Sequence, residues 1–318
     1  MVIGNLTFEN PFFLAPLAGI SDKSMRSLCM QQGASLTFTE MVSAKGLWYG
    51  DRKSRKLLEL APEEKSVGFQ LFGREPEILA HAVKELNDCD NKVFDLNCGC
   101  PVPKVVKNGE GSALLKEPDR LGDVVEAMVK STDKPVTVKI RMGFYRDTMI
   151  AEEIAKVAEA AGAAAITVHG RTREQYYEGK ADWSAIAAVK KAVKIPVIGN
   201  GDIMSGADAI EMMNVTGSNG AMIARGALGN PWIFNECVRL WENSNEVEKP
   251  SQNDRIQMLL DHFELIKMDK GEAIAVREIR KHIGWYVKGM HGASVVKRRA
   301  NTIASGEELR EAVAPLLI

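Results

Sequence analysis

The sequence lacks the features that mark several specialised classes of protein. It holds only five cysteines in 318 residues, an odd number without the spacing of a disulfide framework, which favours a reducing compartment. It has no long apolar span, and no basic stretch followed by an apolar one at its start, so we expect a cytoplasmic protein without a membrane segment. Its net charge is −1, so any contact with nucleic acid has to come from a local basic patch.

Short apolar runs alternate with helical patterns through most of the chain. Eight runs indicate strands: Phe12–Pro16, Leu36–Glu40, Val67–Phe72, Val93–Leu96, Val136–Ile140, Ala165–Val168, Val197–Gly199 and Ala221–Ala224. Most of them are continuously apolar, as expected for parallel strands that are buried on both faces. Eight strand–helix units over about 230 residues predict an α/β fold, a (β/α)8 TIM barrel.

The C-terminal part of the chain has a different pattern. A polar segment from Glu242 to Asp254, which contains Pro250, is typical of a linker. Apolar residues at helical spacing follow it: Ile256, Leu259, Leu260, Phe263 and Ile266, then Ile279, Ile283 and Val287. We therefore predict a barrel domain over residues 1–241 and a small, all-helical domain over residues 250–318.

Polar residues gather at the carboxyl ends of the predicted strands, where the chemistry of this fold is carried out. They are Gln70, Asn97, Cys98, Cys100, Lys139, Arg141, His169, Asn200, Asp202 and Arg225. Each of them alone has a structural explanation, such as a buried amide, a strand-end histidine or a lysine that extends along the surface. Because six strand ends contribute to one rim, the sequence predicts a functional site there.

Glycine-rich turns follow the last two predicted strands, in "GNGD" and "ARGALGNPW". Phosphate is often held at this place in the fold by backbone N–H groups, and Arg225 adds a charged donor; ordinary tight turns are the alternative. With Gln70 and Lys139 across the mouth of the barrel, this arrangement suits FMN, because a cation near N1 and O2 stabilises the reduced ring. Spacing alone does not separate flavin from other phosphorylated ligands. No G-x-G-x-x-G follows a strand, so a Rossmann site for nicotinamide is not indicated.

Several motifs together resemble those of the tRNA-dihydrouridine synthases. They are "LNCGCP", "VKIRMG", "ITVHGRT", "IGNGDI", "MIARGALGNPWIF" and, near the C-terminus, "REIRKHIGWYVKGMHGA" and "RRAN". The resemblance covers nearly the whole chain and is strongest to the bacterial B-type branch, although Leu17 stands where relatives often have Met. It implies an FMN-binding catalytic barrel and a helical tRNA-binding domain. In that reaction NADPH, or NADH, reduces FMN, which passes a hydride to C6 of a tRNA uridine while a cysteine protonates C5.

The resemblance also implies roles for individual residues. Cys100 would be the proton donor, and Asn97 and Arg141 would hold the uracil. FMN would contact Pro16, Leu17, Ala18, Gln70, Lys139, His169, Asn200, Gly201, Asp202, Ala224 and Arg225. A thiol suits proton donation because its ordinary pKa of about 8.5 leaves it protonated at neutral pH. We expect Cys98 to be a small packing residue, and no metal, since a Cys-x-Cys pair alone does not complete a zinc site.

A basic cluster near the C-terminus is the predicted RNA contact. Seven basic residues stand between Arg277 and Arg299, opposed only by Glu278: Arg277, Arg280, Lys281, Lys288, Lys297, Arg298 and Arg299. Cations interspersed with His and Trp suit RNA, although a charge run is usually a solvated helix face. We predict that Arg298 and Arg299 contact tRNA, and no obligate protein partner is evident.

Two other functions remain open at this point. A flavin enzyme that acts on a free pyrimidine, of the dihydroorotate dehydrogenase type, shares the barrel and the cofactor but has no use for the basic helical segment. A non-catalytic RNA-binding protein on a barrel scaffold leaves Cys100, Lys139 and the glycine-rich turns unexplained. The fold alone does not separate them, because this barrel supports many chemistries.

Overall fold

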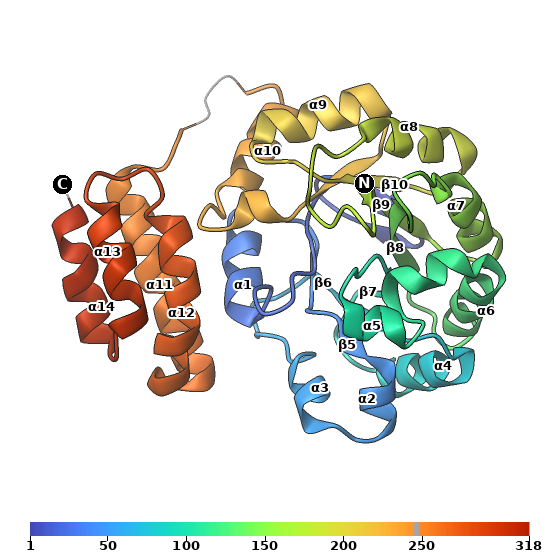
Figure 1. Cartoon of the computed structure of the whole chain (residues 1–318), viewed down its shortest axis with the longest axis horizontal. Coiled ribbons are helices and arrows are strands. Elements are labelled where there is room, and N and C mark those ends of the chain that lie inside the picture. The colour runs from blue at the N-terminus through green and yellow to red at the C-terminus, as the bar shows by residue number, and fades with distance from the viewer. Residues whose placement is uncertain (245–247, 318) are drawn as a thin grey trace.

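A computed structural model of the chain describes residues 1–244 and 248–317. Eight parallel strands form a nearly closed barrel (Figure 1). In the order of their pairing they are β3 (Phe12–Leu14), β11 (Gly220–Ile223), β10 (Val197–Asn200), β9 (Ala165–Thr172), β8 (Val136–Gly143), β7 (Val93–Cys98), β6 (Val67–Phe72) and β4 (Thr37–Phe38). A parallel bridge between Phe13 and Leu36 joins the two ends, and β5 (Val42–Ser43) extends the pairing of β6. The predicted TIM barrel is confirmed.

Helices cover the outside of the barrel (Figure 1). They are α1 (Lys23–Gln31), α2 (Ala44–Trp48), α3 (Arg52–Lys56), α4 (Pro76–Glu85), α5 (Pro103–Lys107), α6 (Pro118–Val129), α7 (Ala151–Ala160), α8 (Trp183–Ala192), α9 (Gly206–Thr216) and α10 (Ile233–Trp241). Ile154 of α7 and Ile186 of α8 are buried against the strands. No helix in the described ranges is long and apolar enough to cross a membrane.

A short N-terminal hairpin closes one end of the barrel. It consists of β1 (Val2–Ile3) and β2 (Leu6–Thr7), and its two-residue strands gave no recognisable pattern in the sequence. Ile3 belongs to a buried hydrophobic cluster together with side chains from inside the barrel, such as Met222. A Cβ on Gly4 would lie 2.8 Å from Pro135, which immediately precedes β8. The hairpin therefore covers the amino ends of the strands, and only the carboxyl ends remain open to a ligand.

The C-terminal helices pack around a core of their own, beside α1 (Figure 1). They are α11 (Gln252–Lys270), α12 (Glu272–Tyr286), α13 (Ala293–Arg299) and α14 (Gly306–Val313). A capping box between Ser251 and Asp254 begins α11. Residues 245–247 of the predicted linker lie outside the described residues, so the division into domains at 241 and 250 stays a prediction. Leu28 of α1 belongs to the helical core, which shows that the two parts pack together.

A buried ion pair joins α1 to the segment that precedes β6. Arg26 and Glu64 are almost inaccessible to solvent, and Nε and Nη2 of Arg26 donate to the two carboxylate oxygens at 2.6 and 3.0 Å. Arg26 also donates to the carbonyl oxygens of Ser21 and Glu59, both at 3.0 Å. The guanidinium therefore holds three chain segments beside the barrel mouth, and its removal leaves a buried carboxylate without its partner.

We predict that Arg26→Leu lowers the free energy of unfolding by about 3–5 kcal/mol, because Glu64 keeps the cost of burial and loses its cation. Urea denaturation followed by circular dichroism measures the change. The matched control is Lys130→Leu, which breaks an ion pair with Glu126 in which both side chains are more than half exposed. We expect that variant to unfold nearly like the parent. Equal effects of the two substitutions would contradict the role given to Arg26.

Candidate active site

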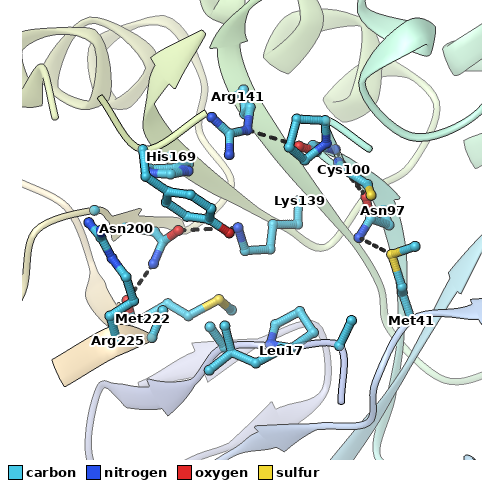
Figure 2. Close-up of a pocket in the computed structure, with 18 of the residues that line it drawn as sticks. Leu17, Met41, Asn97, Cys100, Lys139, Arg141, His169, Asn200, Met222 and Arg225 are labelled. Carbon is cyan, nitrogen blue, oxygen red and sulfur yellow. Dashed lines mark hydrogen bonds between the residues drawn. The ribbon is translucent and has the colours of Figure 1, made fainter. Parts of the chain in front are cut away.

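One cavity lies at the carboxyl ends of the barrel strands (Figure 2). All fourteen barrel residues that the sequence assigned to a site line it: Pro16, Leu17, Ala18, Gln70, Asn97, Cys100, Lys139, Arg141, His169, Asn200, Gly201, Asp202, Ala224 and Arg225. Arg298 and Arg299 do not belong to it, since they are exposed on α13 of the helical bundle. The parallel arrangement of the strands thus brings together residues spread over more than two hundred positions of the chain.

Asn97, at the end of β7, shapes the turn that carries the cysteine. Its Oδ1 accepts hydrogen bonds from the backbone N–H groups of Gly99 at 3.1 Å and Cys100 at 2.9 Å. Its Nδ2 donates to Oε1 of Gln70 at 2.7 Å. Cys100 therefore stands at the cavity wall, whereas Cys98 is fully buried among the strands and helices, as predicted.

A chain of buried polar groups continues from Asn97 into the barrel. Nε2 of Gln70 donates to Oδ2 of Asp95 at 2.7 Å, and Oγ1 of Thr137 donates to Oδ1 at 2.6 Å. Burial raises the pKa of Asp95 to about 6, against the effect of these donors. The carboxylate is thus mostly ionised at neutral pH and fixes which way the Gln70 amide points. Asp95 was missed in the sequence, although a lone carboxylate in an apolar strand was a usable signal.

Lys139 of β8 projects into the middle of the cavity, opposite Leu17 (Figure 2). Its Nζ donates to Oδ1 of Asn200 at 3.2 Å, and Nδ2 of Asn200 donates to the carbonyl oxygen of Met222 at 2.7 Å. Burial, and then the charge of Arg141, lowers the pKa of Lys139 to about 8. The ammonium has no carboxylate bonded to it in the described structure, so it is available to an anionic group of a ligand.

Arg141, two residues further along β8, is held by backbone carbonyl groups. Nε donates to Gly99 at 2.9 Å, and Nη1 donates to Thr172 and Tyr176, both at 2.8 Å. No hydrogen bond within the described residues uses Nη2, which leaves that donor for a ligand. The guanidinium thus ties the Cys100 turn to the loop that follows β9. Burial lowers its pKa to about 10, so it stays charged at neutral pH.

The opposite side of the cavity is the predicted phosphate site. Arg171 and Arg225 donate to the two oxygens of Asp202 at 2.7 and 2.9 Å, so both carboxylate oxygens are engaged within the protein. Gly201 has φ +120°, and a Cβ there would lie 2.9 Å from the ring of His169. Burial, together with the surrounding cations, holds the pKa of His169 well below its usual range, so the imidazole is neutral.

Several lining residues were not identified from the sequence. They include Met41, Met222, Tyr176 and Tyr177. The hydroxyl of Tyr176 donates to the carbonyl oxygen of Pro101 at 3.1 Å, which pins the loop after β9 against the Cys100 turn. The Tyr177 ring lies 4.9 Å from the guanidinium of Arg225 and is half exposed. These tyrosines sit beyond a strand end in "EQYYEG", where only the folded loop decides which way each one points.

The residues present fit FMN in their chemistry. Lysine and amide donors stand at one side of the cavity, and a glycine turn with an arginine stands at the other, where a Cβ at position 201 would meet Ala181 and His169. The groups are those that a flavin ring edge and a phosphate require. Within the described residues, no three His, Cys, Asp or Glu side chains lie together as a metal site.

Comparisons with known proteins agree with this arrangement. The family model described as dihydrouridine synthase matches residues 13–316. The chain is 38% identical over 313 residues to "Probable tRNA-dihydrouridine synthase" of Rickettsia conorii, covering 98% of this chain and 95% of that protein. It is 38% identical over 308 residues to "tRNA-dihydrouridine synthase B" of Pasteurella multocida, covering 97% and 93%. Among solved structures, histamine dehydrogenase from Rhizobium sp. 4-9 shares the fold, with a TM-score of 0.56 and 13% identity over 89% of this chain and 50% of that one.

We predict that the affinity of the cavity for FMN falls as the pH rises through about 8, because Lys139 is cationic below that pH and neutral above it. If only the charged form contributes, the dissociation constant rises by up to about tenfold per pH unit. Quenching of flavin fluorescence between pH 7 and pH 9.5 measures it. Lys139→Met should bind more weakly and lose this pH dependence, whereas Lys190→Met, outside the cavity, should keep it. An unchanged profile in Lys139→Met would assign the titration to another group.

Proposed function

The chain belongs to the dihydrouridine synthase family, and we propose that it is a flavin-dependent enzyme that reduces uridine in tRNA to 5,6-dihydrouridine. The observation that carries the proposal is the position of Cys100. Its thiol lines a cavity that also offers a ring-binding side at Lys139 and a phosphate-binding side at Arg225. A non-catalytic RNA-binding protein has no need for these three groups in one cavity. When bound, FMN supplies the hydride, taken from NADPH and delivered to C6 of the uracil.

Cys100 supplies the proton to C5 in this proposal. Burial raises the pKa of its thiol, so the group carries its proton at neutral pH. The N–H of Val102 and the charges of Arg141 and Lys139 act in the opposite direction and stabilise the thiolate that remains after transfer. The S–H bond breaks as the C–H bond at C5 forms, and solvent returns a proton to sulfur before the next cycle. Asn97 keeps the sulfur in place through the backbone of the turn.

Arg141 and Asn97 position the uracil. Nη2 of Arg141 has no protein partner within the described residues and can donate to a uracil carbonyl oxygen. The Asn97 amide lines the same wall beside the cysteine turn. His169, neutral and buried between Arg171 and the cavity, offers a ring face or a single N–H donor to the flavin rather than a charge. The flavin contacts assigned from the sequence form the remaining walls.

The helical region over residues 250–318 is the proposed tRNA-binding domain, and residues 1–241 are the catalytic domain. Arg298 and Arg299 are exposed at the end of α13, and neither forms an ion pair with a described acidic side chain. Free cations at a helix terminus can contact the phosphate backbone. A uridine must leave its stack to enter the cavity, at a cost of a few kcal/mol, which such contacts help to offset. We further propose NADPH as the preferred reductant and the cytoplasm as the compartment.

The experiment that tests this function is anaerobic. The flavin of the purified protein is reduced with NADPH, unmodified tRNA is added, and reoxidation is followed by absorbance. Rapid reoxidation by tRNA, but not by free uridine, orotate or fumarate, supports the synthase. Reoxidation by a small molecule alone would indicate a free-pyrimidine enzyme of the dihydroorotate dehydrogenase type. If the protein takes up no flavin, the result would favour an RNA-binding protein without catalytic activity.

In the same assay, Cys100→Ala should slow reoxidation by tRNA by at least about a hundredfold, because general acid catalysis contributes on that scale. Reduction of the flavin by NADPH should keep its rate, since the thiol takes no part in that step. The matched control is Cys98→Ala, two positions earlier at the end of β7 and outside the cavity, which should keep both rates. Equal rates of reoxidation in Cys100→Ala and its parent would remove Cys100 as the acid.

We predict that Arg298→Ala raises the dissociation constant of tRNA. It should also make the plot of log association constant against log salt concentration less steep by about 0.9, the value of one lost phosphate contact. Binding is measured by fluorescence anisotropy over a series of salt concentrations. Flavin content and affinity should be those of the parent. The control is Lys191→Ala on the outer helix α8, which should alter neither. Loss of flavin in Arg298→Ala would contradict a role confined to RNA.

A further inference from the structure

The turn between β3 and α1 forms one wall of the cavity and is tightly bonded within itself. Leu17 and Ala18 line the cavity. The N–H groups of Ile20 and Ser21 both donate to the carbonyl oxygen of Leu17 at 2.9 Å. Oγ of Ser21 in turn accepts from the N–H of Leu17 at 2.9 Å. Because these bonds make the turn a single unit, a force on its exposed tip moves the residues that face the ligand.

Gly19 is that exposed tip, and both of its peptide groups are bonded to other elements. Its N–H donates to Oε2 of Glu40, and its carbonyl oxygen accepts from Nζ of Lys281. Glu40 immediately precedes Met41, a second lining residue, so the bond links two walls of the cavity. Gly19 has φ +71° and nothing within 4 Å of a Cβ built on it, so the turn requires glycine for its backbone conformation and not for space.

Lys281 belongs to α12, the helix that carries part of the predicted RNA-binding cluster. Its Nζ bonds to the backbone of a segment that lines the cavity. Two ion pairs beside it hold the same interface: Lys270 with Asp22 at 2.7 Å, and Lys23 with Asp269. Asp22 is also the N-cap of α1, where it accepts from the N–H of Met25 at 3.1 Å. The interface therefore clamps the turn from Leu17 to Asp22 on its outer side.

We propose that Lys281 is a positioning residue for the flavin site, acting through Gly19 on the wall formed by Leu17 and Ala18. It differs in this from Arg277, one turn earlier on α12, which is exposed and makes no bond to the barrel in the described structure. If all the cations of the helical domain served RNA alone, none of them would affect the cavity in the absence of RNA. The bond from Lys281 to Gly19 needs no RNA, so its influence is present in the free protein.

Through the same bond, RNA binding acts on the cavity. A phosphate that approaches the outer face of α12 competes with the Gly19 carbonyl for the Lys281 ammonium, since both are acceptors and the phosphate carries charge. Of the two bonds at Gly19, only the one to Glu40 then remains. Docking of RNA thereby loosens the wall of Leu17 and Ala18 at the moment when a base has to enter. This part rests on the proposed function, whereas the positioning role does not.

The first test needs neither flavin nor RNA. Hydrogen exchange followed by mass spectrometry is measured on peptides covering residues 12–22 in the purified parent protein, Lys281→Met, Lys281→Arg and Arg277→Met. We expect exchange of the turn to rise by about tenfold in Lys281→Met, to return towards the parent in Lys281→Arg, and to stay unchanged in Arg277→Met. Parent-like exchange in Lys281→Met would overturn the proposal, whatever the enzyme turns out to catalyse.

The second test separates positioning from RNA binding. In Lys281→Met we expect the dissociation constant of FMN to rise by about three- to tenfold and the flavin absorbance maximum to shift, both without RNA. A residue that served RNA alone would raise only the tRNA concentration needed for half-maximal rate. Glu40→Ala should act like Lys281→Met, and Glu40→Gln, which keeps an acceptor for Gly19, should be closer to the parent. Normal flavin binding together with weaker tRNA binding in Lys281→Met would restrict Lys281 to RNA.

Discussion

The parallel pairing of the eight barrel strands is the constraint on which the candidate site depends. Parallel strands place all their carboxyl ends at one rim, so every residue that follows a strand faces the same space. The hairpin formed by β1 and β2 covers the other rim, with Ile3 against the barrel interior. Apolar side chains thereby fill one end of the barrel, and the polar groups lie at the other end.

Below that rim, a chain of buried hydrogen bonds between neighbouring strands fixes the position of the Cys100 sulfur. Thr137 and Gln70 donate to Asp95, Asn97 donates to Gln70, and Oδ1 of Asn97 accepts from the N–H of Cys100. Each member is buried, so a missing partner would cost about 1–3 kcal/mol. This cost is the physical reason for the fixed amide orientations beneath the cavity. These buried polar side chains inside an otherwise apolar barrel thus position Cys100.

The cavity is also an unusual charge environment for a chain of net charge −1. Lys139, Arg141 and Arg225 line it, and Arg171 is buried beside it; Asp202 neutralises only Arg171 and Arg225 by direct bonds. Burial, and then the neighbouring cations, lower the pKa of Lys139 and of His169, and the excess of positive charge prepares the site for an anionic ligand. The helical bundle presents its own cations on the surface, and Lys281 connects the two regions through the Gly19 carbonyl.

Residue pattern and chain order were enough to predict the barrel and its eight main strands, because a strand's burial and its end are local properties. The strand ends, together with the family resemblance, gave fourteen of the residues that line the cavity. The short hairpin of β1 and β2 and the two tyrosines after β9 were missed, since two-residue strands and loop side chains leave no periodic signal. Asn97 was expected at the uracil, but only the folded chain placed its amide under the Cys100 turn. Likewise the bond from Lys281 to Gly19 joins positions 262 residues apart, a separation over which no local pattern carries information. Contacts of that kind depend on how the helical bundle packs against α1, and packing is a property of the tertiary structure.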